Sequence, residues 1–161
     1  MEASPRMTTL LTPKEPVPLA LDQVLLTAPI YTEYSGKEYP NLANQLFGFN
    51  EPLDAYCPGC GRHSVFQRAD GEYFDRNSAI DKFFLRFDCS RIAMHEMIFV
   101  FMKEDGVRKI GQYPSIAELS DYDSEKYAKV LGKERYREFK RATGLAAHGI
   151  RVGSFVYLGP I

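Results

Sequence analysis

The feature that most constrains this chain is the spacing of its three cysteines relative to one histidine. The set comprises a Cys-x2-Cys pair, a distant third cysteine and a histidine six positions after it, namely Cys57, Cys60, Cys89 and His95. Such a set offers four soft or borderline ligands, as a tetrahedral zinc ion prefers. Because it uses every cysteine in the chain, none remains for a disulfide or a nucleophilic thiol. The sequence therefore predicts a structural Zn2+ site.

The residues between the paired cysteines suit a tight turn. Pro58 has the φ of the first turn position, and we expect Gly59 to accept a positive φ at the next, so that both sulfur atoms point inward. The other two ligands come from far along the chain. Residues 61–88 are long enough for two short strands and a connection, which is how a zinc ribbon brings its two halves together.

Other interpretations of these residues remain open. A Cys-x2-Cys pair also occurs in redox motifs, but an odd number of cysteines excludes complete internal disulfide pairing, and the spacing suits metal ligation better than a thioredoxin-like βαβ setting. His63 competes with His95 for the fourth position. We prefer His95, because the chain leaving the first turn would carry His63 away from the ion. His148, among small residues, is expected to be an ordinary hydrogen-bonded imidazole.

Composition limits the size and the partners of the fold. With 161 residues, 45% of them hydrophobic, the chain forms one domain, or one domain with an appendage, and buries a sizeable core. The net charge of −1 and the pI near 6.3 exclude a general attraction to nucleic acid or to an anionic membrane, so any such binding is local. The sequence shows neither a secretory signal nor an apolar run of membrane-spanning length. Together with reduced thiols, this indicates the cytoplasm and no membrane partner.

We expect three regions along the chain. Residues 1–18 hold four prolines and form an irregular amino-terminal arm. Residues 19–115 form a zinc-ribbon β domain, and residues 116–161 form a helical carboxy-terminal segment that looks truncated. Within the second region, residues 19–30 are mostly apolar and form either a strand or a buried helix, and the tyrosines that follow lie in a loop.

Strand signals fill the middle of the chain. Three runs have strand character, and they are residues 63–67, 83–89 and 97–102. Asp70-Gly71 predicts a turn between the first two runs, and Asp105-Gly106 predicts a hairpin after the third. We expect these strands to form a twisted antiparallel sheet with the metal at one end.

Helical signals follow Pro114. Asp123-Ser124-Glu125 offers an amino-terminal cap, Gly132 permits a break, and residues 133–141 form a second helical segment. Residues 121–141 hold seven Lys or Arg against five Asp or Glu, which a solvated helix face explains better than a nucleic-acid patch. The predicted fold class is therefore α+β, a zinc-ribbon-like antiparallel sheet followed by a helical carboxy-terminal segment.

The chain ends in mostly apolar residues 153–161, without a polar tail. An aromatic and aliphatic surface of this kind needs a partner. We expect it to pack on the sheet, to form a contact between copies, or to continue in a longer protein.

Taken in order, several motifs resemble those of uncharacterised bacterial proteins that combine a zinc ribbon with a helical carboxy-terminal region. The motifs are Tyr56-Cys57-Pro58-x-Cys60-Gly61, Phe87-x-Cys89-Ser90-Arg91 with His95, Lys109-Ile110-Gly111-Gln112-Tyr113-Pro114-Ser115, and Gly144-Leu145-x2-His148-Gly149-Ile150-x2-Gly153-Ser154-Phe155-Val156-Tyr157-Leu158. The resemblance covers most of the chain beyond about residue 20. It implies the same architecture and, only by association with restriction and abortive-infection genes, a role in bacterial defence. In that group a basic pair and a further helix would follow Leu158, whereas here Gly159-Pro160-Ile161 follow.

Motifs of known enzymes are incomplete in this sequence. His95-Glu96 begins a metalloprotease pattern, but position 99 is Phe instead of the second histidine. Gly132-Lys133 lacks the spacing of a phosphate-binding loop. A zinc ion with four protein ligands also has no open position at which to activate water. We therefore expect no enzymatic activity.

Two classes of function remain. The first is a protein-interaction or scaffold module, in which zinc fixes a small sheet and the helical end docks on a protein partner or on a second copy. The alternative is a nucleic-acid-binding zinc ribbon that uses basic residues around the metal end, because phosphate contacts need local charge and not net charge. Those residues are Arg62, His63, Arg68, Arg86 and Arg91. Nearby carboxylates dilute their field, so we favour the first class.

Overall fold

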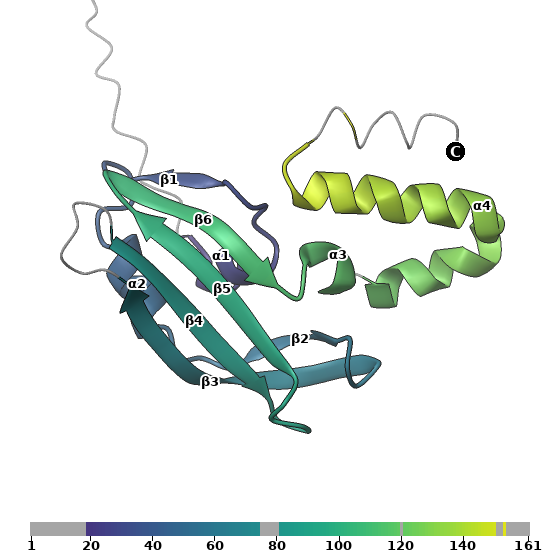
Figure 1. The fold of residues 1–161 in the computed structure, drawn as a ribbon, viewed down its shortest axis with the longest axis horizontal. Helices are drawn as coiled ribbons and strands as arrows, with labels where there is room; N and C mark the ends of the chain where they lie inside the picture. The colour runs from purple at the N-terminus through teal and green to yellow at the C-terminus, as the bar shows by residue number, and fades with distance from the viewer. Residues whose placement is uncertain (1–18, 75–80, 120, 151–152, 154–161) are drawn as a thin grey trace, which may run out of the picture.

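The computed structural model describes residues 19–74, 81–119, 121–150 and 153. In this part of the chain a six-stranded, curled antiparallel sheet is followed by a carboxy-terminal helix (Figure 1). The predicted α+β class is therefore confirmed. The predicted amino-terminal arm and nearly all of the apolar carboxy terminus lie outside the described residues, so both remain predictions.

The sheet is built mainly from consecutive hairpins. Its spatial order is β1-β6-β5-β4-β3-β2, and every neighbouring pair is antiparallel. The strands are β1 Glu33–Ser35, β2 Leu53–Cys57, β3 Arg62–Phe74, β4 Asp81–Cys89, β5 Glu96–Lys103 and β6 Gly106–Tyr113. The hairpin predicted at Asp105-Gly106 is confirmed, since it joins β5 to β6.

One face of the sheet carries the core. Alternate side chains of β4 and β5 point to it because side chains alternate along a strand, and Phe83, Phe87, Phe99 and Phe101 are fully buried there. Two short helices, α1 Leu21–Leu26 and α2 Leu42–Gly48, contribute their buried leucines to the same cluster. Residues 19–30 thus supply a short buried helix, the second of the two predicted alternatives.

Two cations of the sheet cap the carboxyl ends of these helices. The ammonium of Lys109, which is fully buried, donates to the carbonyls of Val24, Leu25 and Ala28 at the end of α1. The guanidinium of Arg68 donates to the carbonyls of Phe47 and Phe49 at the end of α2, both at 3.3 Å. Cations are favourable at this end of a helix, where the last carbonyls lack partners within the helix.

The turn predicted at Asp70-Gly71 was wrong. Both residues lie inside β3, which runs on as far as Phe74. The register of β3 against β4 shifts between Arg68 and Asp70. A bulge of this kind accommodates turn-favouring residues without ending the strand, and it lets Arg68 reach the core. The predicted tyrosine loop likewise contains the short strand β1.

Helices follow the sheet. The first is α3 Ile116–Leu119, and the second is α4 Asp121–Ala147, which therefore begins before the predicted Asp123 cap. At Gly132, with φ 74° and ψ 166°, α4 bends sharply, so the predicted break is confirmed (Figure 1). The end of α4 is tied to the sheet side of the molecule because the Ile30 amide donates to the Ala147 carbonyl at 3.3 Å.

Candidate metal centre

Two connections meet at one end of the sheet. The β2–β3 connection begins after Cys57 and contains Cys60, and the β4–β5 connection runs from Cys89 to His95. In a run of hairpins, every second connection lies at the same end of the sheet. Because β3 pairs directly with β4, these two connections lie side by side, and they bring together residues that are 29 to 38 positions apart in the sequence.

The first connection is a tight turn. The amides of Cys60 and Gly61 both donate to the Cys57 carbonyl, at 3.1 and 2.9 Å. Gly61 has a φ of 63°, whereas Gly59, for which we expected the positive φ, does not. The left-handed position is therefore one residue beyond the predicted one.

Gly59 is needed for a different reason. A Cβ atom added at this position would lie 2.7 Å from three atoms of the His95 ring. A Cβ atom essentially never lies this close to a heavy atom to which it is not bonded, so a side chain here would push the imidazole away. The glycine of the first turn thus makes room for the ligand contributed by the second.

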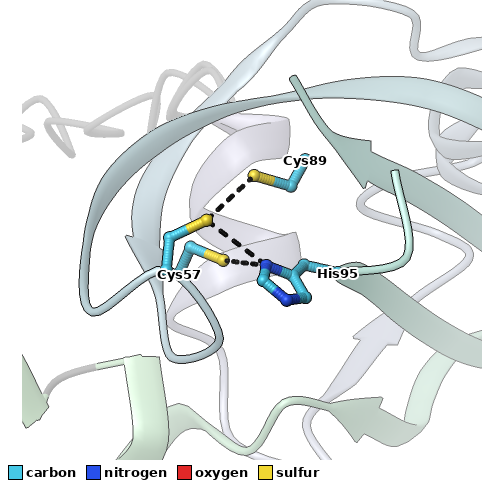
Figure 2. Close-up of side chains that lie close together, drawn as sticks. Cys57, Cys89 and His95 are labelled. Atoms are coloured by element: carbon cyan, nitrogen blue, oxygen red, sulfur yellow. Dashed lines mark hydrogen bonds between the residues drawn. The ribbon is translucent and has the colours of Figure 1, made fainter. Parts of the chain in front are cut away.

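The second connection folds back on itself. The Cys89 amide donates to the His95 carbonyl at 2.8 Å, and the His95 amide donates to the Ile92 carbonyl at 2.9 Å. The Ser90 amide donates to the Val65 carbonyl of β3 at 2.9 Å, which fixes this loop to the neighbouring strand. These bonds place the His95 side chain next to the cysteines (Figure 2).

The four predicted ligand atoms lie close together, all within 4.8 Å of one another. The Sγ atoms of Cys60 and Cys89 are 3.8 Å apart. The Nδ1 atom of His95 lies 3.6 Å from Cys57 Sγ and 3.3 Å from Cys60 Sγ. A tetrahedral zinc ion with ordinary bond lengths separates two sulfur ligands by about 3.8 Å and a sulfur from a nitrogen by about 3.6 Å. These three separations are close to those values, so the cluster is compatible with a metal ion such as Zn2+, with His95 presenting Nδ1.

Electrostatics at the cluster also favour a cation. Burial by itself would raise the pKa of the Cys89 thiol, but hydrogen bonds from Ser64 and from the amides of Ile92 and Arg91 lower it to about 6. Burial, followed by the contacts with the other two cysteines, raises the pKa of Cys60. Three adjacent thiolates repel one another, so a metal ion would replace the protons that neutralise them.

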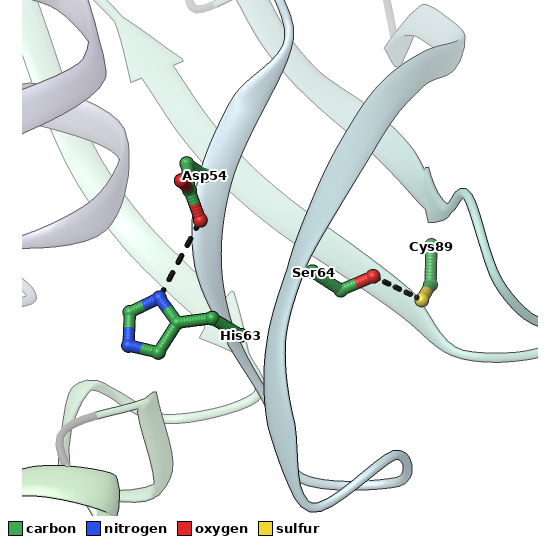
Figure 3. Close-up of polar contacts among 4 residues, drawn as sticks. All are labelled: Asp54, His63, Ser64 and Cys89. Carbon is green, nitrogen blue, oxygen red and sulfur yellow. Dashed lines mark hydrogen bonds and ion pairs between the residues drawn. The ribbon is translucent and has the colours of Figure 1, made fainter.

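Ser64 is a residue that the sequence analysis missed. It is buried, and its Oγ lies 3.1 Å from Cys89 Sγ (Figure 3). Its neighbour His63 points to the opposite face of β3, where its Nδ1 lies 3.4 Å from a carboxylate oxygen of Asp54. Alternation along β3 therefore separates them, and it could have been used to predict both positions. The structure brings His95 to the cysteines and does not bring His63.

The five basic residues proposed for a nucleic-acid surface differ in their surroundings. Arg68 turns toward the core, where its guanidinium lies 5.5 Å from the centre of the Phe87 ring. Arg86 is ion-paired with Asp70 at 2.9 Å and with Asp88 at 3.3 Å. Arg62 and Arg91 are exposed, and His63 contacts Asp54 as described above.

Comparisons with known proteins give no match for this chain. No family model matches it, and neither the curated proteins nor the solved structures yield a match. Among the described residues, no helix combines the length and the apolar character needed to cross a membrane. The candidate site therefore rests on the geometry of its own residues.

Proposed function

We propose that this chain is a non-enzymatic module stabilised by one Zn2+ ion, which Cys57, Cys60, Cys89 and His95 bind. The observation that carries the proposal is the grouping of the four donor atoms within 4.8 Å of one another, with three separations of 3.3 to 3.8 Å that suit tetrahedral coordination. Zinc would join the β2–β3 and β4–β5 connections and so fix one end of the sheet. Four protein ligands complete its coordination, which supports a structural role over a catalytic one.

We further propose that the metal end contacts another protein molecule. Met94 is 90% exposed and Tyr113 is 59% exposed. Both line a small hollow beside the cluster, together with Pro58, Phe66 and Pro114. Apolar side chains that remain exposed beside one another favour a contact site, because burying them against a partner removes apolar surface from water.

Nucleic-acid binding at the metal end has less support. Of the basic residues considered for it, Arg68 is used to cap a helix and Arg86 is paired with carboxylates. A role in bacterial defence rests on the resemblance of the sequence motifs alone, and the genes that neighbour this one would test it.

Elemental analysis tests the zinc site. The purified, untagged protein should contain about one zinc ion per chain, since four ligands make one site. Cys89→Ser should lose the metal and His95→Ala should retain it weakly, whereas the matched variant His63→Ala should keep full stoichiometry. Absence of metal from the freshly reduced protein, or equal retention by the two histidine variants, would contradict the assignment.

Sedimentation velocity on the zinc-loaded protein tests the contact. We expect association that grows with concentration and that Met94→Glu removes without loss of zinc. Val130→Glu is the matched control, since Val130 is 82% exposed on α4. A chain that stays monomeric at all concentrations would argue against contact between copies.

A further inference from the structure

The three cysteines of the metal centre differ in their exposure. Cys57 is 1% exposed and Cys89 is 3% exposed, and each is the last residue of a strand. Cys60 is only half-buried and lies in the β2–β3 connection. Because oxidation of cysteines follows their exposure as well as their thiolate character, Cys60 is the sulfur that an oxidant in solution reaches first.

Hydrogen bonds distinguish the same cysteines. The Oγ atom of Ser64 lies 3.1 Å from Cys89 Sγ, and the amides of Arg91 and Ile92 also donate to this sulfur. In the described part of the chain, Cys60 Sγ has its contacts with the other three ligands of the cluster and with no hydroxyl or amide. Donors withdraw electron density from a thiolate and so lower its reactivity toward an electrophile. They therefore protect Cys89 and leave Cys60 as the more reactive sulfur.

A second cysteine lies beside Cys60. Its Sγ atom is 3.8 Å from Cys89 Sγ. A disulfide requires the two sulfurs about 2.0 Å apart, so they must approach by about 1.8 Å. Cys60 lies in a connection and not in a strand, so rotation of its side chain and a small shift of the turn supply this movement. We propose that hydrogen peroxide converts the site to a Cys60–Cys89 disulfide and releases its zinc ion, an inference that rests on the zinc site proposed above.

The reaction takes two steps. The Cys60 thiolate attacks one peroxide oxygen, so that an S–O bond forms, the O–O bond breaks and hydroxide leaves, and the sulfur is oxidised to a sulfenic acid. The Cys89 thiolate then attacks the Cys60 sulfur, so that the S–S bond forms, the S–O bond breaks and a second hydroxide leaves. Two protons from solvent convert both hydroxides to water. The two thiolates thus lose two electrons in total, one peroxide is reduced to two waters, and Zn2+ leaves as a hydrated ion because two of its four ligands are gone.

The disulfide would join the same two connections as the metal does. Cys60 lies in the β2–β3 connection, and Cys89 is the residue from which the β4–β5 connection starts. Oxidation therefore keeps this end of the sheet closed, and it frees His95, whose neighbour Met94 belongs to the proposed contact with another protein molecule. Peroxide could in this way change the contact surface while the sheet stays folded.

The test adds hydrogen peroxide to the zinc-loaded protein, whose metal content is measured first, and follows zinc release with a chromophoric chelator. We expect about one zinc ion to be released per chain. Mass spectrometry of the digested protein should find a Cys60–Cys89 disulfide, with Cys57 still open to alkylation. Dimedone, which traps sulfenic acids, should label Cys60 first. Dithiothreitol with added Zn2+ should restore the zinc-loaded protein.

Two variants test the order of reaction. Ser64→Ala removes the hydroxyl beside Cys89 without changing a ligand, so the share of dimedone on Cys89 should rise. The control is Ser90→Ala, at an exposed serine next to Cys89, and it should match the parent. Cys60→His keeps four ligands and removes the sulfur that reacts first, so zinc release should slow by about tenfold or more. The disulfide found in the parent protein decides the proposal even if this variant binds no zinc.

The outcomes separate this proposal from the zinc site itself. A Cys57–Cys60 disulfide, first labelling of Cys89, or retention of zinc under peroxide would each overturn the proposal and leave the zinc site standing. Equal labelling of Cys89 in Ser64→Ala and in the parent would overturn the protective role of Ser64. A protein that holds no zinc before peroxide is added would contradict the zinc site, and the proposed release with it.

Discussion

Lys109 gives the protein a dependence of stability on pH that can be worked out from its surroundings. Its side chain is fully buried, its ammonium donates to three carbonyls at the end of α1, and Phe99 lies against it, with its ring centre 5.4 Å from Nζ. Burial lowers the pKa of Lys109 from 10.5 to about 7. Between these two values the unfolded chain binds a proton that the folded protein does not bind.

The sign follows from this difference. Stability rises with pH wherever the unfolded state holds more protons, so the free energy of unfolding should increase from pH 7 toward 10.5. Well below pH 7, Lys109 is protonated in both states, so its titration adds no pH dependence there. The slope approaches about 1.4 kcal/mol per pH unit, which amounts to about 2 kcal/mol between pH 7 and 9. Measurements should stop near pH 9, because burial and a nearby tyrosine raise the pKa of Tyr34 above 10.0, so its ionisation in the unfolded chain lowers stability at higher pH.

Lys109→Met isolates the effect. At pH 9 the lysine of the parent protein is mainly neutral and still donates hydrogen bonds, so its loss leaves carbonyls at the end of α1 without donors and should cost about 1–3 kcal/mol. Toward pH 7 the difference between the two proteins should shrink by about 2 kcal/mol, since only the parent protein has a buried amine to desolvate. Urea unfolding of the zinc-loaded proteins at pH 7, 8 and 9 measures this. The exposed Lys82→Met variant is the control and should follow the parent. A constant difference between Lys109→Met and the parent across this range would refute the reasoning.

Two further substitutions test how side chains support the site and the sheet. Gly59→Ala should weaken zinc affinity by about 10–100-fold, because the added Cβ atom displaces His95, and competition with a chromophoric chelator measures this. The control is Gly48→Ala, which should bind zinc normally because a Cβ atom added there meets nothing within 4 Å. Equal zinc affinities of the two variants would contradict this role of Gly59. Arg68→Met should lower the free energy of unfolding by about 1–3 kcal/mol in urea titrations, because the carbonyls of Phe47 and Phe49 lose their donor. Unchanged stability, as expected for the exposed Arg62→Met, would show that this cap is dispensable.

The sequence predicts which residues form the candidate site because each half of the site carries its own local signal. A Cys-x2-Cys pair defines one connection, and strand alternation before Cys89 defines the end of β4, so hairpin geometry is enough to bring the two together. The position of Ser64 beside Cys89 could also have been predicted, from the alternation of side chains along β3. The role of Gly59 was not, because it depends on a ring contributed from 36 positions away.

The core was harder to predict than the site. Arg68 and Lys109 look like ordinary surface cations in the sequence, and they face the core only because α1 and α2 end where these strands pass. The strand β3 continues through the predicted Asp70-Gly71 turn because a bulge between Arg68 and Asp70 accommodates these residues. Contacts between segments that are far apart in the sequence decide which polar groups are buried, and local sequence patterns do not predict such contacts.

Removal of the metal should loosen one end of the sheet and leave the rest folded. Among the residues that the structure describes, 17 form the main buried core cluster, and of these only Cys57 and Cys89 belong to the metal centre. Phe83 and Phe101 lie at the opposite ends of their strands from this centre, with ring centres 5.2 Å apart. Each large apolar side chain contributes roughly 1.5–3 kcal/mol when fully buried, so this part of the core does not depend on zinc.

Hydrogen exchange on the protein before and after chelation measures this difference. We expect the amides of Cys60, Cys89 and His95 to lose protection, because their hydrogen bonds close the two connections that the metal joins. Amides in the middle of β4 and β5 should stay protected, and the far-ultraviolet circular dichroism should change little. Loss of protection throughout the sheet would show instead that zinc binding provides most of the folding energy, as in small zinc fingers. Unchanged exchange at all three amides would show that no metal had joined the two connections, because closure of the turns would then rest on backbone hydrogen bonds alone.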